Sequence, residues 1–170
     1  NSKISLLLCY LIQSHNRFKT GPLEHQLLSG VRYSEETPEN AVKGLKITDD
    51  LKVSLFAHEP MLVNPTNIDI DEKGRVWVCE GYNYRYSLNP GNPYNNAGDR
   101  IVILEDTDAD GIADKQTVFY QGEDINAALG IAVLGNKVIV SRSPDVFVFT
   151  DENNDGIADK KDTLFTGISG

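Results

Sequence analysis

The stretch Asp106-Thr-Asp-Ala-Asp-Gly-Ile-Ala-Asp-Lys115 returns 45 positions later as Asp151-Glu-Asn-Asn-Asp-Gly-Ile-Ala-Asp-Lys160, without a gap and with seven of ten residues identical. Apolar residues upstream of each stretch also repeat, at offsets of 62 to 63 positions: Ile68, Ile70, Val76 and Val78 match Ile131, Val133, Val138 and Val140. The larger offset reflects a Tyr- and Asn-rich insertion at 81–99 in the first copy. One structural module is therefore present twice.

Each copy consists of short stretches in which apolar residues alternate with polar ones or occupy both faces, as in strands of packed β-sheets. The expected strands are 52–57, 67–71, 75–80, 100–105, 117–120, 129–134, 137–141, 146–150 and 163–165. Four strands in a repeat of about 40–50 residues are typical of a propeller blade.

The sequence therefore predicts an all-β fold, a partial β-propeller with about two four-stranded antiparallel blades of a larger, six-bladed propeller. A β-sandwich is the alternative. Because a single blade cannot bury both of its faces, the repeat predicts further blades. The insertion cannot be a strand, and loops of this length in compact domains are commonly functional or mobile.

The apolar run at 4–12 follows Lys3 and is shorter than the roughly 20 residues that span a bilayer, so no transmembrane helix is expected. A basic residue before a short apolar run is typical of a secretory signal, with a buried helix or strand of the mature protein as the alternative. We expect residues 1–14 to be a clipped signal segment, 15–44 an exposed leader and 45–170 the first blades of an incomplete propeller. The expected location is secreted, in the periplasm or on the cell surface.

The net charge of -9 and the absence of clustered Lys and Arg argue against nucleic-acid binding. The acidic excess suits cations instead, because the repeated stretches place oxygen-bearing residues at positions 1, 3, 5 and 9 of a calcium-type loop with Gly at position 6. The predicted ligands, with the position-7 carbonyls included, are Asp106, Asp108, Asp110, Ile112 and Asp114, and then Asp151, Asn153, Asp155, Ile157 and Asp159. Neither loop has the bidentate Glu of an EF-hand at position 12, and a plain solvated hairpin turn is the alternative.

Five stretches, at 51–70, 74–85, 98–108, 119–130 and 164–170, carry a resemblance to a known family. They include Leu-Phe-Ala-His-Glu-Pro at 55–60 and Trp-Val-Cys-Glu-Gly-Tyr-Asn-Tyr-Arg at 77–85. Here the chain resembles the PVC-type membrane-bound dehydrogenase domain, a family of large secreted bacterial propeller proteins. The resemblance implies a propeller similar to the soluble quinoprotein glucose and sorbosone dehydrogenases.

The function that the resemblance implies is a quinone-dependent sugar or alcohol dehydrogenase. Such an enzyme would use pyrroloquinoline quinone. It would pass electrons to a haem c domain if a CxxCH motif occurs elsewhere in the chain. No residue here matches the catalytic His of such propellers, which we expect in later blades. Arg85 and Asn67 are the predicted cofactor contacts, and the guanidinium of Arg85 suits a carboxylate or quinone oxygen. The alternative is a non-catalytic, calcium-stabilised propeller that binds carbohydrate or protein, because propellers host both kinds of function.

Overall fold

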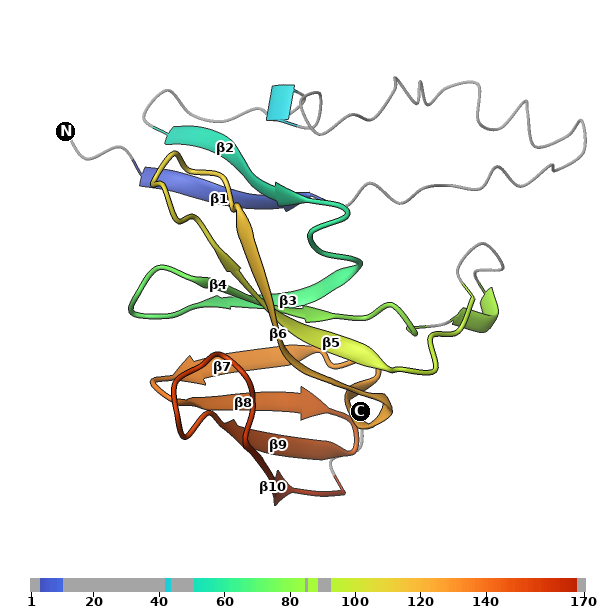
Figure 1. The fold of residues 1–170 in the computed structure, drawn as a ribbon. Helices are drawn as coiled ribbons and strands as arrows, with labels where there is room; N and C mark the ends of the chain where they lie inside the picture. The colour runs from blue at the N-terminus through green and yellow to red at the C-terminus, as the bar shows by residue number, and fades with distance from the viewer. Residues whose placement is uncertain (1–3, 11–41, 44–50, 85, 89–92, 168–170) are drawn as a thin grey trace, which may run out of the picture.

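The computed structural model describes residues 4–10, 42–43, 51–84, 86–88 and 93–167. These residues form two four-stranded antiparallel sheets and a separate two-stranded parallel sheet (Figure 1). Nearly all of the expected leader at 15–44 lies outside the described residues. Within the described ranges, no helix has the length and hydrophobicity needed to cross a membrane.

Each four-stranded sheet is a meander in which every strand pairs antiparallel with the next one. The first blade contains β3 (Pro65–Ile70), β4 (Val76–Glu80), β5 (Asp99–Glu105) and β6 (Lys115–Gly122), in that order across the sheet. The second blade contains β7 (Gly130–Leu134), β8 (Lys137–Arg142), β9 (Asp145–Thr150) and β10 (Lys160–Phe165). The predicted all-β class and the two antiparallel blades are confirmed, and the total number of blades stays a prediction.

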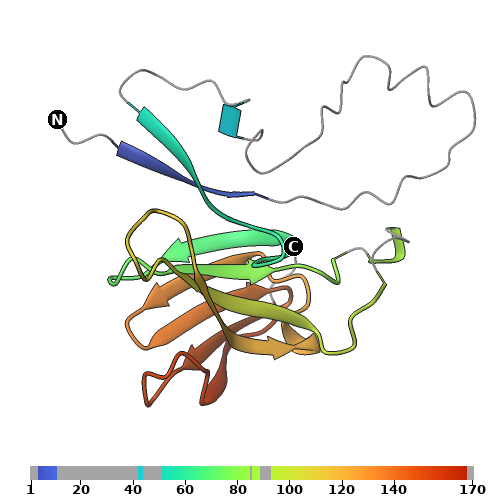
Figure 2. The same ribbon diagram turned by 45° about the horizontal axis from the view of Figure 1, so that its top comes forward.

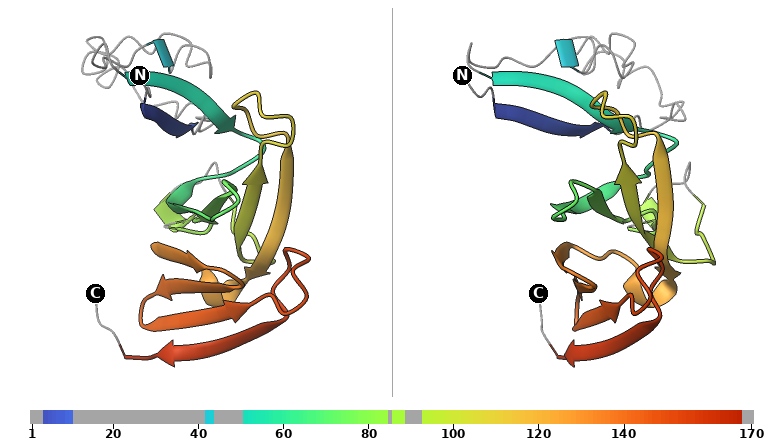
Figure 3. Two further views of the ribbon diagram at one scale, coloured as in Figure 1. Left: turned by 90° about the vertical axis from the view of Figure 1, so that its left-hand side faces the viewer. Right: turned by 60° about the vertical axis from the view of Figure 1, so that its left-hand side comes forward.

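The third sheet is made by β1 (Ile4–Tyr10) and β2 (Leu51–His58), which pair in parallel. The two blades and this small sheet follow one another along an arc, with the first blade in the middle (Figures 2 and 3). Strand β1 covers much of the predicted signal segment at 1–14, and cleavage of that segment stays a prediction.

The observed outer strands are longer than the sequence pattern indicates. Strand β10 begins at Lys160 rather than at 163, because residues 160–162 pair with Thr150, Phe149 and Val148 across the sheet. All residues of β10 are exposed. An outermost strand is held by backbone hydrogen bonds and can carry polar side chains along its whole length. The alternation of apolar residues therefore does not show where such a strand begins or ends.

Alternate residues of the first blade face two different cores. Trp77 and Cys79 on β4 point toward the second blade, whereas Val76 and Val78 point toward the chain around β2. The core between the blades contains Trp77, Cys79, Ile101, Ile103, Phe119, Ile125, Ala128, Val138, Val140, Phe147 and Phe149. The core on the other face contains Phe56, Ala57, Leu62, Val76, Val78, Val102, Leu104 and Ala113. Burial of both faces confirms the reading of β4 and β5 as strands packed on both sides.

Phe119 of β6 lies at the centre of the core between the blades. Its ring makes edge contacts with Trp77 of its own blade, at a centroid distance of 4.8 Å, and with Phe149 of the second blade, at 6.2 Å. Phe119 therefore joins the two blades through aromatic packing, which adds to the free energy of apolar burial.

Replacing Phe119 with Ala should lower the free energy of unfolding by about 3–5 kcal/mol, because the substitution leaves a cavity between the blades. The measurement is denaturant unfolding of the intact protein followed by circular dichroism. Val118→Ala is the matched control, since Val118 is the preceding residue of β6 and is 37% exposed. Equal losses of unfolding free energy in Phe119→Ala and Val118→Ala would contradict this packing.

The turn between β3 and β4 is organised by the buried carboxylate of Asp71. It accepts hydrogen bonds from the backbone N–H of Lys73 (2.9 Å) and of Arg75 (2.9 Å), from Arg75 Nε (2.6 Å) and from Trp77 Nε1 (3.0 Å). Burial acts to raise the pKa of Asp71, but the hydrogen bonds from Trp77, Arg75 and Lys73 outweigh it and hold that pKa below its ordinary value of 3.8. The charged form of Asp71 is therefore the one that stabilises the fold.

Asp71→Asn should cost about 2 kcal/mol of stability at neutral pH, because hydrogen bonds to a charged acceptor are lost. A folded-state pKa below the unfolded one gives a stabilisation that is complete above about pH 4 and is lost as the pH falls through the folded pKa. The difference between the variant and the parent should therefore shrink below pH 4 in thermal melts recorded as a function of pH. Glu72→Gln, at the exposed neighbouring carboxylate, should show no such trend.

Candidate functional site

The loops of the two blades divide between two ends of the sheets. The insertion between β4 and β5 and the linker at 123–129 between β6 and β7 lie at one end (Figure 1). The two acidic loops, at 106–114 and 151–159, lie at the opposite end together with the short β3–β4 and β7–β8 turns. The innermost strands, β3 and β7, lie side by side where the blades meet.

A buried polar network holds the insertion against the linker. The carboxylate of Asp99, which is 1% exposed, accepts hydrogen bonds from the backbone N–H of Asn83 (2.8 Å) and of Ala127 (2.8 Å). The side-chain oxygen of Asn126 accepts from the Asp99 N–H (2.9 Å) and from Asn83 Nδ2 (3.1 Å). Burial raises the pKa of Asp99, and the two backbone hydrogen bonds oppose the rise. Asn83 also bonds both backbone groups of Asn95, so it anchors the insertion near both of its ends.

Tyr86 and Tyr94 of the insertion are exposed to solvent next to this network. Tyr86, on the short 3-10 helix η1 (Tyr86–Leu88), is 47% exposed and Tyr94 is 36% exposed. Their rings make an edge contact at a centroid distance of 4.7 Å. The Tyr94 hydroxyl donates to Glu123 Oε1 (2.8 Å) and accepts from Asn126 Nδ2 (3.0 Å). We call Tyr86, Tyr94, Glu123 and Asn126 the rim cluster.

The rim cluster has the composition of a site for a hydroxyl-rich ligand. Aromatic faces bury the C–H surface of such a ligand, and a carboxylate such as that of Glu123 accepts hydrogen bonds from its hydroxyls, whereas the Asn126 amide is engaged in holding Tyr94 and Asp99. The hydrogen bond to Glu123 raises the pKa of Tyr94, so the phenol remains a proton donor in the neutral range. The sequence predicts that the insertion is a functional or mobile loop, but the contact between Tyr94 and Glu123 could not be predicted, because it depends on the folded linker.

The neighbouring ion pair of Glu80 and Arg100 is structural. Arg100 donates through Nε to Glu80 Oε2 (2.6 Å) and through Nη2 to Glu80 Oε1 (2.9 Å). The backbone N–H of Val63 also donates to Glu80 Oε1 (2.9 Å). Burial raises the pKa of Glu80, and the Arg100 guanidinium opposes that rise. The donor fork of Arg100 is thus engaged by a buried carboxylate and is not offered to a ligand.

Of the two predicted cofactor contacts, only Asn67 belongs to the described residues. Asn67 lies on β3, and its Nδ2 donates to the carbonyl of Leu129 at 3.0 Å, so it joins the innermost strand to the linker. Arg85 lies outside the described residues. Pyrroloquinoline quinone carries three carboxyl groups, whereas β3 and β7 contain neither Lys nor Arg. The described inner strands therefore do not fit this cofactor by themselves.

The two acidic loops have the same internal hydrogen bonds. In the first, the carboxylate of Asp106 accepts from the backbone N–H of Asp110 (3.2 Å) and of Gly111 (2.8 Å). In the second, Asp151 accepts from Asp155 (3.2 Å) and Gly156 (2.9 Å). Both loops join the third and fourth strands of a blade, so the repeat read from the sequence has one structure in both copies.

Three carboxylates of the predicted calcium ligand set lie close together. Carboxylate oxygens of Asp106, Asp108 and Asp114 lie within 4.8 Å of one another. Among the described residues, no comparable group forms in the second loop or includes Asp110. The Oδ1 atom of Asp110 accepts from the Ile112 N–H at 2.8 Å, which is a turn interaction. Calcium binding by these loops stays a prediction.

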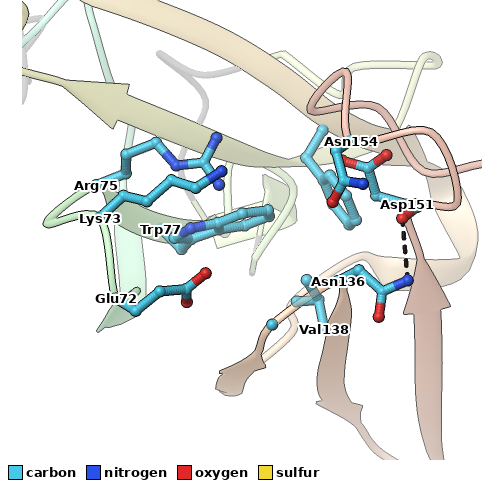
Figure 4. A pocket seen from close by; sticks show the side chains of 10 residues that line it. Glu72, Lys73, Arg75, Trp77, Asn136, Val138, Asp151 and Asn154 are labelled. Atoms are coloured by element: carbon cyan, nitrogen blue, oxygen red, sulfur yellow. Dashed lines mark hydrogen bonds between the residues drawn. The ribbon is translucent and has the colours of Figure 1, made fainter.

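A pocket of about 210 Å³ lies between the blades at the acidic-loop end (Figure 4). It is lined by Glu72, Lys73, Arg75, Trp77, Phe119, Gly135, Asn136, Val138, Asp151 and Asn154. Asn136 Nδ2 donates to the carbonyl of Asp151 at 3.2 Å, and Arg75 is paired with Asp71. Each of these two interactions lies within one blade, and the sequence contains no motif that indicates this pocket.

If the first acidic loop binds calcium, millimolar calcium should raise the melting temperature of the intact protein, and Asp108→Asn should remove most of that rise. The substitution removes one charge and keeps an oxygen that can accept from the Asp110 N–H. Glu152→Gln is the control, because Glu152 is an exposed acid outside the predicted ligand set. Identical melting curves of the parent in calcium and in chelator would exclude the ion.

Comparison with known proteins gives one family and one solved structure. Residues 37–170 match the family described as Domain of unknown function (DUF7133). No curated protein matches the chain. The holo form of the pyranose dehydrogenase PQQ domain from Coprinopsis cinerea is 22% identical, with a TM-score of 0.47 over 64% of this chain. The chain spans 22% of the length of that protein chain.

Proposed function

The chain belongs to the family described as Domain of unknown function (DUF7133), and from this premise we propose that its blades form part of the substrate-binding rim of a sugar or alcohol dehydrogenase. The observation that carries the proposal is the rim cluster, whose exposed tyrosines stand on a loop clamped by buried Asp99. Tyr94, whose hydroxyl is bonded to Asn126 of the same network, can offer its ring to a ligand with little loss of conformational entropy.

The reaction class comes from the sequence resemblance to PVC-type dehydrogenases and quinoprotein propellers, and the rim cluster supports the choice of binding surface. The described residues would bind and orient the ligand, whereas the catalytic base and the cations that hold the quinone would come from other blades. Secretion to the periplasm or cell surface and electron transfer to a haem c domain belong to the same proposal. In such an enzyme the cofactor carries the redox chemistry and the protein supplies orientation.

A second function is favoured by the group of Asp106, Asp108 and Asp114 and by the lack of cations on β3 and β7. It is a non-catalytic, calcium-stabilised propeller that binds carbohydrate or protein at the same rim. The two functions differ in turnover and share the binding surface.

The intact protein should reduce an artificial electron acceptor when supplied with pyrroloquinoline quinone and a sugar or alcohol from a panel of substrates. Binding of the same sugars without any dye reduction would favour the non-catalytic function. If the protein neither binds nor oxidises any compound of the panel, that result would contradict the role proposed for the rim.

Tyr94→Ala should weaken sugar binding roughly tenfold, because it removes one aromatic face and the hydroxyl that bonds Glu123. The change should appear in KM, or in Kd from calorimetric titration, with little effect on kcat. Ile157→Ala is the control, since Ile157 is an exposed apolar residue of the second acidic loop at the opposite end of the blades. Unchanged affinity in Tyr94→Ala would place the ligand elsewhere.

A further inference from the structure

The end of β2 with the segment after it and the end of β6 with the linker after it occupy equivalent positions, each against the blade that follows. Phe56 and Phe119 lie 63 positions apart, and so do Leu62 and Ile125. All four side chains are buried. The segment after β2 can therefore be aligned with the linker after β6 at an offset of 63 positions.

The same backbone hydrogen bond joins each of these strands to the acidic loop of the following blade. The Ala113 N–H in the first acidic loop donates to the carbonyl of Phe56 at 2.8 Å. The Ala158 N–H, at the same position of the second acidic loop, donates to the carbonyl of Phe119 at 2.9 Å. We call these two places the first and the second junction, and they can be compared residue by residue.

At the second junction, the ring of Tyr120 packs between the second blade and the linker. Its centroid lies 4.5 Å from that of Phe149, and its hydroxyl donates to Asp124 Oδ2 at 3.1 Å. Lys161 pairs with the same carboxylate and lies 5.9 Å from the centre of the Tyr120 ring. A phenol of the chain itself is thus held between an aromatic ring and an ion pair.

At the first junction, the residues equivalent to Tyr120, Asp124 and Lys161 surround a pocket instead of a ring. Gln116 Nε2 donates to the carbonyl of Met61, so the strand and the segment after β2 remain in contact without an ion pair. The pocket has a volume of about 440 Å³. Its lining includes the three equivalent residues and three neighbours: Ala57, Met61, Gln116, His58, Pro60 and Ile112. The exchange of tyrosine for alanine removes the ring from a place where the backbone arrangement is kept.

We propose that the pocket at the first junction binds a small neutral phenol, which takes the place that the side chain of Tyr120 has at the second junction. The volume lies within the roughly 300–1,000 Å³ that is common for small-molecule pockets. The apolar surfaces of Pro60 and Ile112 and the thioether of Met61 suit the faces and edges of an aromatic ring. The proposal is independent of the activity proposed for the rim, because no member of the rim cluster lines this pocket.

The polar groups of the pocket favour a phenol over a hydrocarbon or an anion. His58 Nδ1 lies 2.5 Å from the carbonyl oxygen of Glu59, and since a carbonyl only accepts, Nδ1 carries the proton. In the neutral imidazole, Nε2 then has a lone pair that can accept the proton of a hydroxyl group. Asp114 also lines the pocket, so a carboxylate ligand would meet a like charge.

The probe that tests the proposal is p-cresol, which is the tyrosine side chain as a free molecule. Calorimetric titration of the intact protein should show saturable binding of p-cresol, and weaker binding of toluene and of p-hydroxybenzoate. No saturable binding of p-cresol would overturn the proposal, and this is the result expected if another part of the chain already fills the pocket. Equal affinity for toluene or for p-hydroxybenzoate would also overturn it.

A matched pair of variants locates the bound probe. Ile112→Asp should weaken p-cresol binding roughly tenfold, because a charge replaces an apolar contact. Ile157→Asp is the control, since Ile157 has the same position in the second acidic loop and is 54% exposed, against 53% for Ile112. At such exposed positions neither variant should unfold the protein. Equal weakening in both variants, or weakening in neither, would overturn the proposal.

Two further variants exchange the chemistry of the junctions. Ala57→Tyr should abolish p-cresol binding, because the new ring occupies the pocket, and unchanged binding would overturn the proposal. Tyr120→Ala should lower the melting temperature and create a second site, so that p-cresol restores part of the loss and two molecules bind. Binding of one molecule without any rescue would overturn the equivalence of the two junctions. If either variant does not fold, the comparison of Ile112→Asp with Ile157→Asp decides.

Discussion

A blade of this protein has two apolar faces, and neither can remain in water without cost. Strands β4 and β5 show the constraint most clearly, because successive residues such as Val76 and Trp77 are buried against different neighbours. The first blade satisfies it through the second blade on one side and through Phe56 and Leu62 on the other. The fold and the placement of the loops follow from stacking blades in this way, since stacking buries the sheet faces and leaves the loops at two ends.

The all-β class, the two blades and the equivalence of the acidic loops could be predicted from the sequence, because they depend on local alternation and on a gap-free repeat. The ends of β6 and β10 could not, since outer strands hold their register through the backbone while their side chains are largely polar. The similarity of the β2 segment to the β6 segment was also not predicted, because Phe56 and Leu62 lie 63 positions before Phe119 and Ile125 and match them in burial, but the surrounding sequence differs.

Candidate site residues could be predicted where all of them lie in one short stretch of the sequence. Asp106, Asp108 and Asp114 converge because one loop carries all three, and the turn geometry of that loop is local. The rim cluster joins Tyr94 of the insertion to Glu123 and Asn126 of the linker, so it exists only after the blade has formed. Asn67, which was predicted to contact a cofactor, bonds the backbone of Leu129 through Nδ2, so a polar residue on an inner strand also serves the junction between blades.

The single tryptophan of the sequence, Trp77, sits where the two blades meet, with its indole N–H bonded to Asp71 and its ring against Phe119. The emission of this indole is consequently an intrinsic optical reporter on one junction of the ring. Separation of the first and second blades would admit water to the indole and shift its emission to the red. Assembly of the propeller can thus be followed at a defined interface without attaching a label.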